Sequence, residues 1–325
     1  MQDFSITRPA SLDAAIAAAQ APDSAFIAGG TDLMQLMKDR VENPVRLVDL
    51  DALPLDAIRP GPDGITSGAL VRMADFAAHP VVVRDYPAVS QALLASASPQ
   101  VRNMGTMGGN LLQRTRCLYF RDTGFACNKR APGSGCPAIA GENRNLAVLG
   151  TSPDCIASHP SDLAVALVAS DAMLSLRGTN GQQRRIAVAD LYRTPGNTPN
   201  IDTVLQPGEL IESIFIPQSE TARRSAYVKV RDRASFEFAL ISAAVGIAID
   251  GGTIRAARVA MGGVGSKPWR LPQVEAALTG QPASEATFAV AAALAADGAQ
   301  PSSQSAFKLK LMPRVALRAL QAAAA

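Results

Sequence analysis

The first 55 residues switch between helix-like and strand-like spacing of apolar positions. Ser11 can cap the first helical run, and Pro22 lies just beyond its end. Gly29 and Gly30 interrupt the pattern directly after a short apolar run of strand type. The spacing predicts a helix, a strand, a second helix and a second strand over residues 12–20, 25–28, 31–38 and 46–50. This order indicates a small α/β lobe that ends near residue 55.

The next segment, residues 56–217, alternates short strand-like runs with turns and helix-like stretches. Strands are predicted over residues 64–69, 172–177 and 210–216, and helices over 90–97 and 161–169. Residues 113–155 show no period and are rich in Arg, Gly, Asn, Pro and Cys. Such a long irregular stretch within a compact domain is usually functional or disordered.

After Pro217 the pattern changes to three strand-like runs, followed by Ala-rich helical sequence from residue 271 onward. The strands are predicted over residues 226–231, 239–249 and 254–261, with a hairpin turn at 250–252. This change predicts two domains, residues 1–217 and 218–325. We expect the first to consist of a lobe over about 1–55 and a larger lobe over about 56–217, with 113–155 as an insertion.

Composition and charge exclude several classes of protein. Of 325 residues 48% are apolar, too many for a disordered chain. Basic and acidic residues nearly balance, 31 against 28, so charge makes no case for nucleic acid or acidic lipid. The N-terminus lacks a signal-peptide pattern, and the apolar stretch 238–249 is shorter than the roughly 20 residues that span a bilayer. We expect a cytoplasmic protein, or a periplasmic one exported with a partner that carries a twin-arginine signal.

Two glycine-rich loops are candidates for phosphate binding. Gly29-Gly30-Thr31-Asp32 joins a strand to a helix, and residues 102–111 read Arg-Asn-Met-Gly-Thr-Met-Gly-Gly-Asn-Leu. Glycine lets backbone N–H groups approach an anion closely. Either loop alone is more simply a tight connection, and the first has neither the Rossmann nor the P-loop fingerprint. Two such loops in one chain favour a ligand with two phosphates.

Four cysteines, Cys117, Cys127, Cys136 and Cys155, fall within 39 residues. A chain of this length needs no disulfides, so the crowding suggests a metal centre. The intervals C-x9-C-x8-C-x18-C differ from the paired spacing of zinc ribbons and fingers. Zinc, a cubane iron–sulfur cluster and four unrelated thiols all remain open on spacing alone. The sequence neighbours of the cysteines include four basic residues, Arg116, Arg121, Lys129 and Arg130. Basic neighbours are expected beside metal-binding thiolates, whereas unrelated free thiols usually lie in apolar surroundings.

The remaining polar residues show no hydrolytic machinery. His79 and His159 are isolated, and the chain lacks both the H-E-x-x-H and the G-x-S-x-G motif. Taken alone, Lys229 is best explained as a solvated charge on an edge strand. Asp162, at a predicted helix start, is best explained as an N-cap.

Together these segments resemble the FAD-binding medium subunits of the molybdenum hydroxylases, the group of xanthine dehydrogenase, carbon monoxide dehydrogenase and aldehyde oxidoreductase. The resemblance is carried by residues 28–33, 102–111, 160–164, 209–211, 227–231 and 259–265. It implies an α+β fold: a two-lobed FAD-binding domain of vanillyl-alcohol-oxidase type, then a C-terminal domain of CO-dehydrogenase-flavoprotein type. That C-terminal domain has a three-stranded antiparallel sheet with helices.

The chain departs from the family pattern in two ways. Gly105 and Met107 replace the usual Ala and Ile of the second loop, both mild exchanges. About 50 residues separate Asn110 from Asp162, where simple members have a short link. This insertion is similar to the one in flavoprotein subunits of bacterial periplasmic aromatic-aldehyde oxidoreductases, which implies a [4Fe–4S] cluster on the four cysteines. The β subunit of 4-hydroxybenzoyl-CoA reductase also has a cluster-bearing insertion, with different cysteine intervals.

The resemblance implies roles for particular residues. The residues implied in cofactor binding are Ile27, Ala28, Gly29, Gly30, Thr31, Asp32, Leu33, Arg102, Thr106, Gly108, Gly109, Asn110, Asp162, Ile211 and Lys229. The backbone of both loops would hold the pyrophosphate, and Lys229 would stabilise negative charge on the reduced flavin. No residue of this chain is implied in substrate chemistry.

The implied assembly is a heterotrimer with a large molybdenum-cofactor subunit, which would oxidise an aldehyde, and a small [2Fe–2S] subunit. FAD on this chain would pass electrons to an external acceptor such as a quinone, a ferredoxin or oxygen. Alternative readings are the β subunit of a 4-hydroxybenzoyl-CoA-reductase-like or xanthine-dehydrogenase-like complex, a stand-alone flavin oxidase, and a non-redox binding protein with structural zinc.

Overall fold

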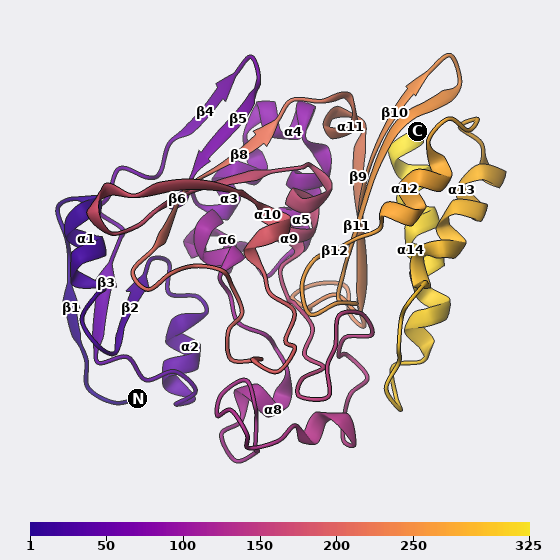
Figure 1. Ribbon diagram of the computed structural model, residues 1–325. Helices are drawn as coiled ribbons and strands as arrows, with labels where there is room; N and C mark the ends of the chain where they lie inside the picture. The colour runs from indigo at the N-terminus through magenta and orange to yellow at the C-terminus, as the bar shows by residue number, and fades with distance from the viewer.

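The computed structural model describes residues 1–325. It contains three β-sheets, each formed by strands from one part of the sequence (Figure 1). The first sheet is parallel and has the strand order β1-β3-β2. Its strands are β1 (Ser5–Thr7), β2 (Ser24–Ile27) and β3 (Arg46–Asp49), joined by helices α1 (Leu12–Ala18) and α2 (Leu33–Lys38). The predicted α/β lobe is therefore present. Strand β1 is an addition that the sequence pattern did not predict.

The second sheet is antiparallel, with the order β4-β5-β8-β6-β7. Its strands are β4 (Ile58–Gly61), β5 (Gly64–Gly68), β6 (Met173–Arg177), β7 (Gln183–Ala187) and β8 (Leu210–Pro217). The helices of this part are α3 (Met73–Ala78), α4 (Pro80–Asp85), α5 (Pro87–Ala95), α6 (Pro99–Met104), α7 (Met107–Leu111), α9 (Asp162–Ala169) and α10 (Val188–Leu191). All eight residues of α9 are buried, so this helix forms the centre of the largest apolar core.

The third sheet is antiparallel, with the order β12-β11-β10-β9. Its elements are α11 (Glu220–Arg223), β9 (Ser225–Val230), β10 (Ile241–Asp250), β11 (Thr253–Gly262), β12 (Trp269–Arg270), α12 (Pro272–Leu278), α13 (Glu285–Ala293) and α14 (Phe307–Ala324). Helices α12, α13 and α14 cover one face (Figure 1), and α5 and α9 pack against the sheet from the preceding part of the chain. The three predicted strands are confirmed, and the two-residue strand β12 adds a fourth.

The cysteine-rich insertion is ordered and lies at the bottom of the view in Figure 1. It contains only helix α8 (Leu118–Arg121) and a 3-10 helix (Pro137–Ile139); two further 3-10 turns lie at Thr179–Gly181 and Leu294–Ala296. Residues of the insertion form most of a separate apolar core. No helix of the chain has the length and hydropathy needed to cross a membrane.

Candidate functional site

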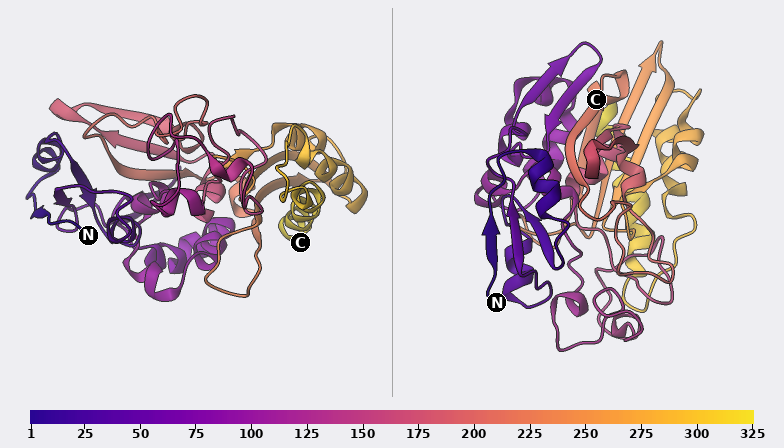
Figure 2. Two further views of the ribbon diagram at one scale, coloured as in Figure 1. Left: turned by 90° about the horizontal axis from the view of Figure 1, so that it is seen from below. Right: turned by 60° about the vertical axis from the view of Figure 1, so that its left-hand side comes forward.

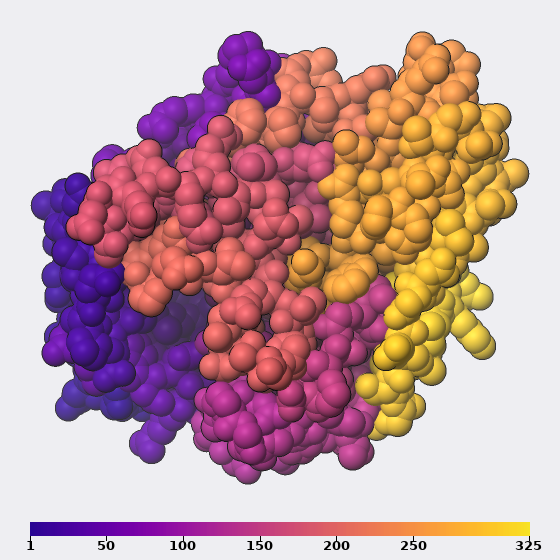
Figure 3. All heavy atoms as spheres, in the orientation of Figure 1, coloured from indigo at the N-terminus to yellow at the C-terminus, as the bar shows by residue number.

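A cavity of about 570 Å³ opens between the N-terminal lobe and the later segments, where the surface is visibly hollowed (Figure 3). Its walls are mostly apolar with a few convergent polar groups, as is usual for a cofactor site. The residues implied in cofactor binding that line it are Ile27, Ala28, Gly29, Gly30, Thr31, Asp32, Leu33, Thr106, Gly108, Gly109, Asn110, Asp162, Ile211 and Lys229. Residues as far apart in the sequence as Ile27 and Lys229 thus share one cavity.

Arg102 is the one residue of the implied set that does not line the cavity. Its guanidinium donates to the carbonyl oxygen of Ser96 at 2.7 Å. This bond ties helix α6 to the end of helix α5.

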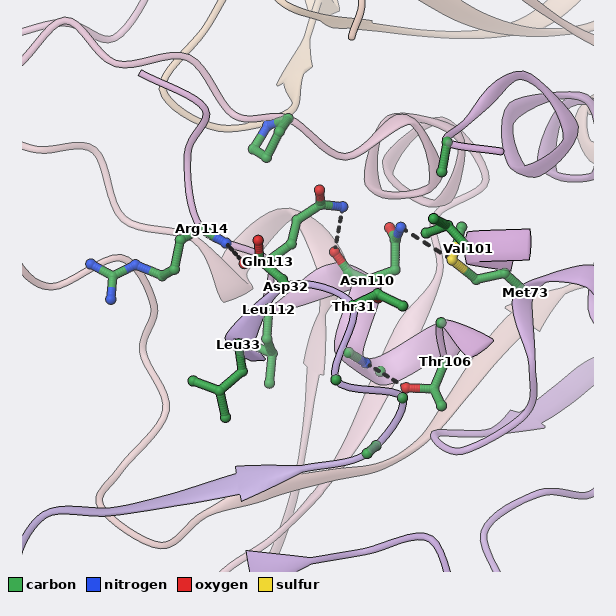
Figure 4. A pocket seen from close by; sticks show the side chains of 18 of the residues that line it. Thr31, Asp32, Leu33, Met73, Val101, Thr106, Asn110, Leu112, Gln113 and Arg114 are labelled. Atoms are coloured by element: carbon green, nitrogen blue, oxygen red, sulfur yellow. Dashed lines mark hydrogen bonds between the residues drawn. The ribbon is translucent and has the colours of Figure 1, made fainter. Parts of the chain in front are cut away.

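The two glycine loops pack directly against each other. A Cβ atom at Gly29 would overlap the carbonyl oxygen of Met104, and one at Gly108 would lie 2.9 Å from the Cβ of Ala69. Gly30 has a φ of +66°, which side chains rarely adopt. Thr106 caps helix α7 by accepting a hydrogen bond from the N–H of Gly109 at 3.1 Å (Figure 4). Close packing therefore demands these glycines, whatever ligand lies in front of them.

Asp32 connects the first loop to the cysteine insertion. Its carboxylate accepts hydrogen bonds from the N–H of Arg114 at 2.8 Å and from the guanidinium groups of Arg116 at 2.9 Å and Arg121 at 2.7 Å. Figure 4 shows the first of these bonds at the cavity wall. The side chain of Asp32 makes no helix-capping bond. Sequence reasoning placed Asp32 in the loop but did not foresee these partners, which lie more than 80 residues away.

Asp162 and Lys229 form a buried ion pair at the cavity wall, with 2.7 Å between Oδ2 and Nζ and 4% exposure for each side chain. The hydroxyl of Tyr227 donates to the other carboxylate oxygen at 2.5 Å. Burial raises the pKa of Tyr227 well above its ordinary value, so it remains a donor. Lys229 is therefore not a solvated edge charge. Asp162 is not the N-cap either, because Ser161 caps α9 by accepting from Ala164 N–H at 3.0 Å.

The segment that enters strand β8 is held by a paired carboxylate. Glu209 accepts two hydrogen bonds from Arg184, each 2.7 Å long, and a third from the N–H of Gln206 at 3.0 Å. The bonds from Arg184 hold the pKa of Glu209 below its usual value. Because Ile211 follows two residues later, as the second residue of β8, this pair fixes the backbone at the cavity wall.

The loop between β9 and β10 was missed by sequence reasoning. Arg233, Phe236 and Phe238 from this loop line the cavity. The guanidinium of Arg116, from the insertion, stacks over the Phe238 ring at 4.8 Å. Phe236 and Phe238 are both exposed. The one signal available in the sequence was the presence of two aromatic residues between two predicted strands.

All four cysteines line one small cavity inside the insertion, together with Tyr119, Phe120 and Ala138. None is in a disulfide; Cys117, Cys127 and Cys155 are buried and Cys136 is half-buried. Burial raises the pKa of the Cys117 thiol to about 11. Nowhere in residues 1–325 do three or more His, Cys, Asp or Glu side chains converge on a point that could hold a single metal ion.

The basic neighbours of the cysteines mostly have other partners. Arg116 and Arg121 pair with Asp32, and Lys129 donates to the carbonyl oxygen of Pro199 at 2.8 Å. Arg130 donates to the carbonyl oxygens of Tyr119 at 3.0 Å and Phe120 at 2.7 Å. These side chains therefore hold the loops of the insertion around the cysteines.

Comparison with known proteins agrees with this geometry. Residues 2–219 match the family model for the FAD binding domain in molybdopterin dehydrogenase, and residues 225–323 match that for the CO dehydrogenase flavoprotein C-terminal domain. The aldehyde oxidoreductase FAD-binding subunit PaoB of Escherichia coli is 48% identical over 303 residues, 93% of this chain and 92% of the relative. The carbon monoxide dehydrogenase medium chain of Afipia carboxidovorans is 26% identical over 99% of this chain and 97% of its own length.

Solved structures agree as well. Quinoline 2-oxidoreductase from Pseudomonas putida aligns with a TM-score of 0.77 and 25% identity over 99% of this chain and 97% of that one. Carbon monoxide dehydrogenase from Hydrogenophaga pseudoflava has the same fold, with a TM-score of 0.77 and 24% identity over 99% of this chain and 97% of its own. The FAD-binding family model matches, the similarity extends over nearly the whole chain, and a cavity lies between the two loops. We conclude that the chain belongs to the family of FAD-binding medium subunits of the molybdenum hydroxylases, and that it is an oxidoreductase subunit.

Proposed function

We propose that the chain is the FAD- and [4Fe–4S]-binding electron-transfer subunit of a heterotrimeric molybdenum hydroxylase that oxidises aldehydes, aromatic ones in particular. A large partner would carry the molybdenum cofactor and a small partner the [2Fe–2S] clusters. The observation that carries the proposal is the single cavity lined by both glycine loops and by the Asp162–Lys229 pair. The similarity to a subunit named for aldehyde oxidation supports the choice of substrate class.

The cavity fits FAD in size and in the chemistry of its walls. Backbone of residues 29–32 and 106–110 would hold the pyrophosphate, and apolar side chains such as Ile27 and Leu33 would cover the rest. FAD supplies the exchange between two-electron and one-electron chemistry. The chain contributes position and charge, and the buried Lys229 is fixed by its bonds to Asp162 at 2.7 Å and to the Ala95 carbonyl at 3.1 Å. We assign residues 1–217 to the FAD-binding domain and 218–325 to the C-terminal domain.

The arrangement of the four cysteines around one cavity supports a cubane cluster in this proposal. Four thiolates around one zinc ion, each at about 2.3 Å, would lie within about 4 Å of one another. The four cysteines share one cavity but do not converge on a single ion position. In a cubane each thiolate binds a different iron, which suits ligands placed around a common cavity. Raised thiol pKa values mean that binding of the cluster must displace protons.

The test is the cofactor content of anaerobically purified protein, measured as flavin, iron, acid-labile sulfide and zinc. We expect one FAD and a broad iron–sulfur absorption beneath the flavin bands. Cys136→Ser should lower bound iron, whereas the matched control Ile139→Ser, an exposed position in the same insertion, should not. Colourless protein that contains zinc, or unchanged iron in the Cys136→Ser variant, would contradict the cluster assignment. To test whether the large partner oxidises the substrate, an aromatic aldehyde is added to the complex and to the isolated chain. We expect it to reduce the flavin in the complex but not in the isolated chain.

A further inference from the structure

A second cavity, which we call the side cavity, adjoins the cavity assigned to FAD (the flavin cavity) and has a volume of about 150 Å³. The residues that line both cavities are Arg116, Pro160, Asp162, Glu237 and Phe238. Asn145 and Asp232 also line the side cavity, and both are exposed. The side cavity therefore extends from the wall of the flavin cavity toward solvent.

Ser242 lines the side cavity from the face of the third sheet that meets helix α9. In strand β10 it pairs with Lys229 of β9 and with Gly262 of β11, and directly paired residues point to the same face. A Cβ atom at Gly262 would lie 2.6 Å from both Oγ of Ser242 and a side-chain carbon of Val165 in α9. Figure 2 shows this sheet between the C-terminal helices on one side and the earlier part of the chain on the other. The Ser242 hydroxyl therefore lies on the same face as Lys229, which pairs with Asp162 at the start of α9.

Two buried polar atoms of the side-cavity lining have no protein partner. Ser242 is fully buried, and its Oγ makes no hydrogen bond. His159 accepts the N–H of Ser161 at 3.3 Å through Nδ1, and burial lowers its pKa to about 4, so the neutral ring carries its proton on Nε2. That Nε2 is buried and has no acceptor. Unpaired buried polar atoms are destabilising, and a polar cavity with room for several waters satisfies them with water.

The charges of the side cavity argue against an anionic or a metal ligand. Its lining carries the carboxylates of Asp162, Asp232 and Glu237 and one guanidinium, that of Arg116. The guanidinium is already paired with Asp32, so no free cation remains for an anion. No three His, Cys, Asp or Glu side chains converge on a metal position. Water is the ligand that these walls fit, because it both donates and accepts hydrogen bonds.

We propose that the side cavity holds a hydrogen-bonded chain of waters that carries protons between solvent and the flavin at the Asp162–Lys229 wall. The inference rests on the proposed function and adds a proton route to it. Two electrons and one proton convert an oxidised flavin to its anionic reduced form, and reoxidation returns that proton to water. A flavin that fills the mostly apolar flavin cavity excludes water there, so the proton needs a separate polar path.

Asp162 is the group at which this path meets the flavin cavity. Its Oδ1 accepts from Tyr227 at 2.5 Å and its Oδ2 accepts from Lys229 at 2.7 Å. Each carboxylate oxygen offers two lone pairs, so each can accept one further hydrogen bond from water. Lys229 uses a second proton on the Ala95 carbonyl oxygen at 3.1 Å, which leaves one N–H of three for the flavin cavity. The ion pair can therefore stay charged while waters beside it move the proton.

The test measures proton release directly. The full-length chain, loaded with FAD and reduced anaerobically with stoichiometric dithionite, is mixed with ferricyanide in a weakly buffered stopped-flow experiment. Each reduced flavin gives one electron to each of two ferricyanide ions and releases one proton, so flavin absorption reports the electrons and phenol red reports the proton. Crystal structures of the FAD-loaded chain report the waters of the side cavity.

Three variants change the proposed path and one serves as the control. Ser242→Ala removes the hydroxyl from the side cavity, and Ser242→Thr keeps one there. His159→Phe removes the Nε2 donor but keeps a ring against Tyr192. The control Ser24→Ala removes another buried hydroxyl oxygen without a partner, on strand β2 and outside both cavities.

We expect proton release to keep pace with flavin oxidation in the wild type and to slow by about tenfold in Ser242→Ala and in His159→Phe at unchanged flavin content. Ser242→Thr and Ser24→Ala should stay within about twofold of the wild type. The crystal structures should show ordered water on Ser242 Oγ in the wild type, and its loss in Ser242→Ala.

Three outcomes would overturn the inference alone. They are unchanged proton release in both Ser242→Ala and His159→Phe, equal slowing in Ser24→Ala, and a side cavity without ordered water in the crystal of the wild type. Wild-type protein that binds no flavin would overturn the proposed function as well.

Discussion

Replacement of Asp32 by Asn tests the connection between the flavin loop and the cysteine insertion. The carboxylate accepts bonds from Arg116 and Arg121, whose side chains are 27% and 14% exposed, while that of Asp32 is 16% exposed. A desolvated charge-assisted bond contributes about 1.5–3 kcal/mol, and the partial exposure of Arg116 reduces its share. We therefore expect Asp32→Asn to lower the free energy of unfolding by about 2–4 kcal/mol.

The same change should weaken flavin binding, because Asp32 directly precedes helix α2 and lies two residues after Gly30. If the substitution destabilises the FAD-bound state by about 1.4 kcal/mol more than the FAD-free folded state, the FAD dissociation constant rises about tenfold. Urea unfolding followed by circular dichroism gives the first quantity, and quenching of FAD fluorescence on titration gives the second. The control is Asp51→Asn, which breaks the exposed 3.2 Å pair with Arg72 and should cost less than about 1 kcal/mol. Equal losses in the two variants would refute the reasoning.

Three further predictions concern single residues. Gly29→Ala should abolish FAD binding or folding, because the added Cβ would overlap backbone atoms. The control Gly61→Ala should not, because the nearest atom to its Cβ would lie at 3.6 Å. Comparable flavin content in the two variants would count against the packing argument. Lys229→Met should lower the flavin midpoint potential, because it removes a buried cation. Asp162→Asn should raise that potential, because it leaves the charge of Lys229 unpaired. Shifts of the same sign in the two variants, measured by spectroelectrochemistry, would contradict this. Burial lowers the pKa of Lys308 to about 7 in the folded chain. Between pH 7 and 10 the unfolded chain therefore binds one more proton than the folded chain, and the free energy of unfolding rises with pH by up to about 1.4 kcal/mol per pH unit. Lys308→Met should flatten this slope, measured by urea unfolding at several pH values.

The sequence pattern located most elements because their cause is local. Ser11 accepts the N–H of Ala14 at 3.2 Å as expected for an N-cap, and the hairpin at 250–252 joins β10 to β11. Strands β1, β4, β7 and β12 were missed; β1 and β12 have only three and two residues, which is too short for a readable period. Their pairing depends on neighbouring strands that are already in place.

The candidate site divides in the same way. The glycine loops and the four cysteines stood out in the sequence as unusual local composition, and each set meets at one cavity. The roles of charged residues did not stand out. Nothing in the sequence separates Lys229 from Arg102, yet the first is buried at the cavity wall and the second bonds to the carbonyl oxygen of Ser96.

The sequence by itself located the helices and strands that have a clear apolar period, the two glycine-rich loops and the clustering of four thiols along the chain, because these follow from spacing within a few residues. Only the tertiary structure decided which charges meet. Arg121 reaches Asp32 across 89 positions, and Lys229 reaches Asp162 across 67. Such pairs depend on how separate sheets pack, and the burial that gives them their strength exists only once the chain has folded.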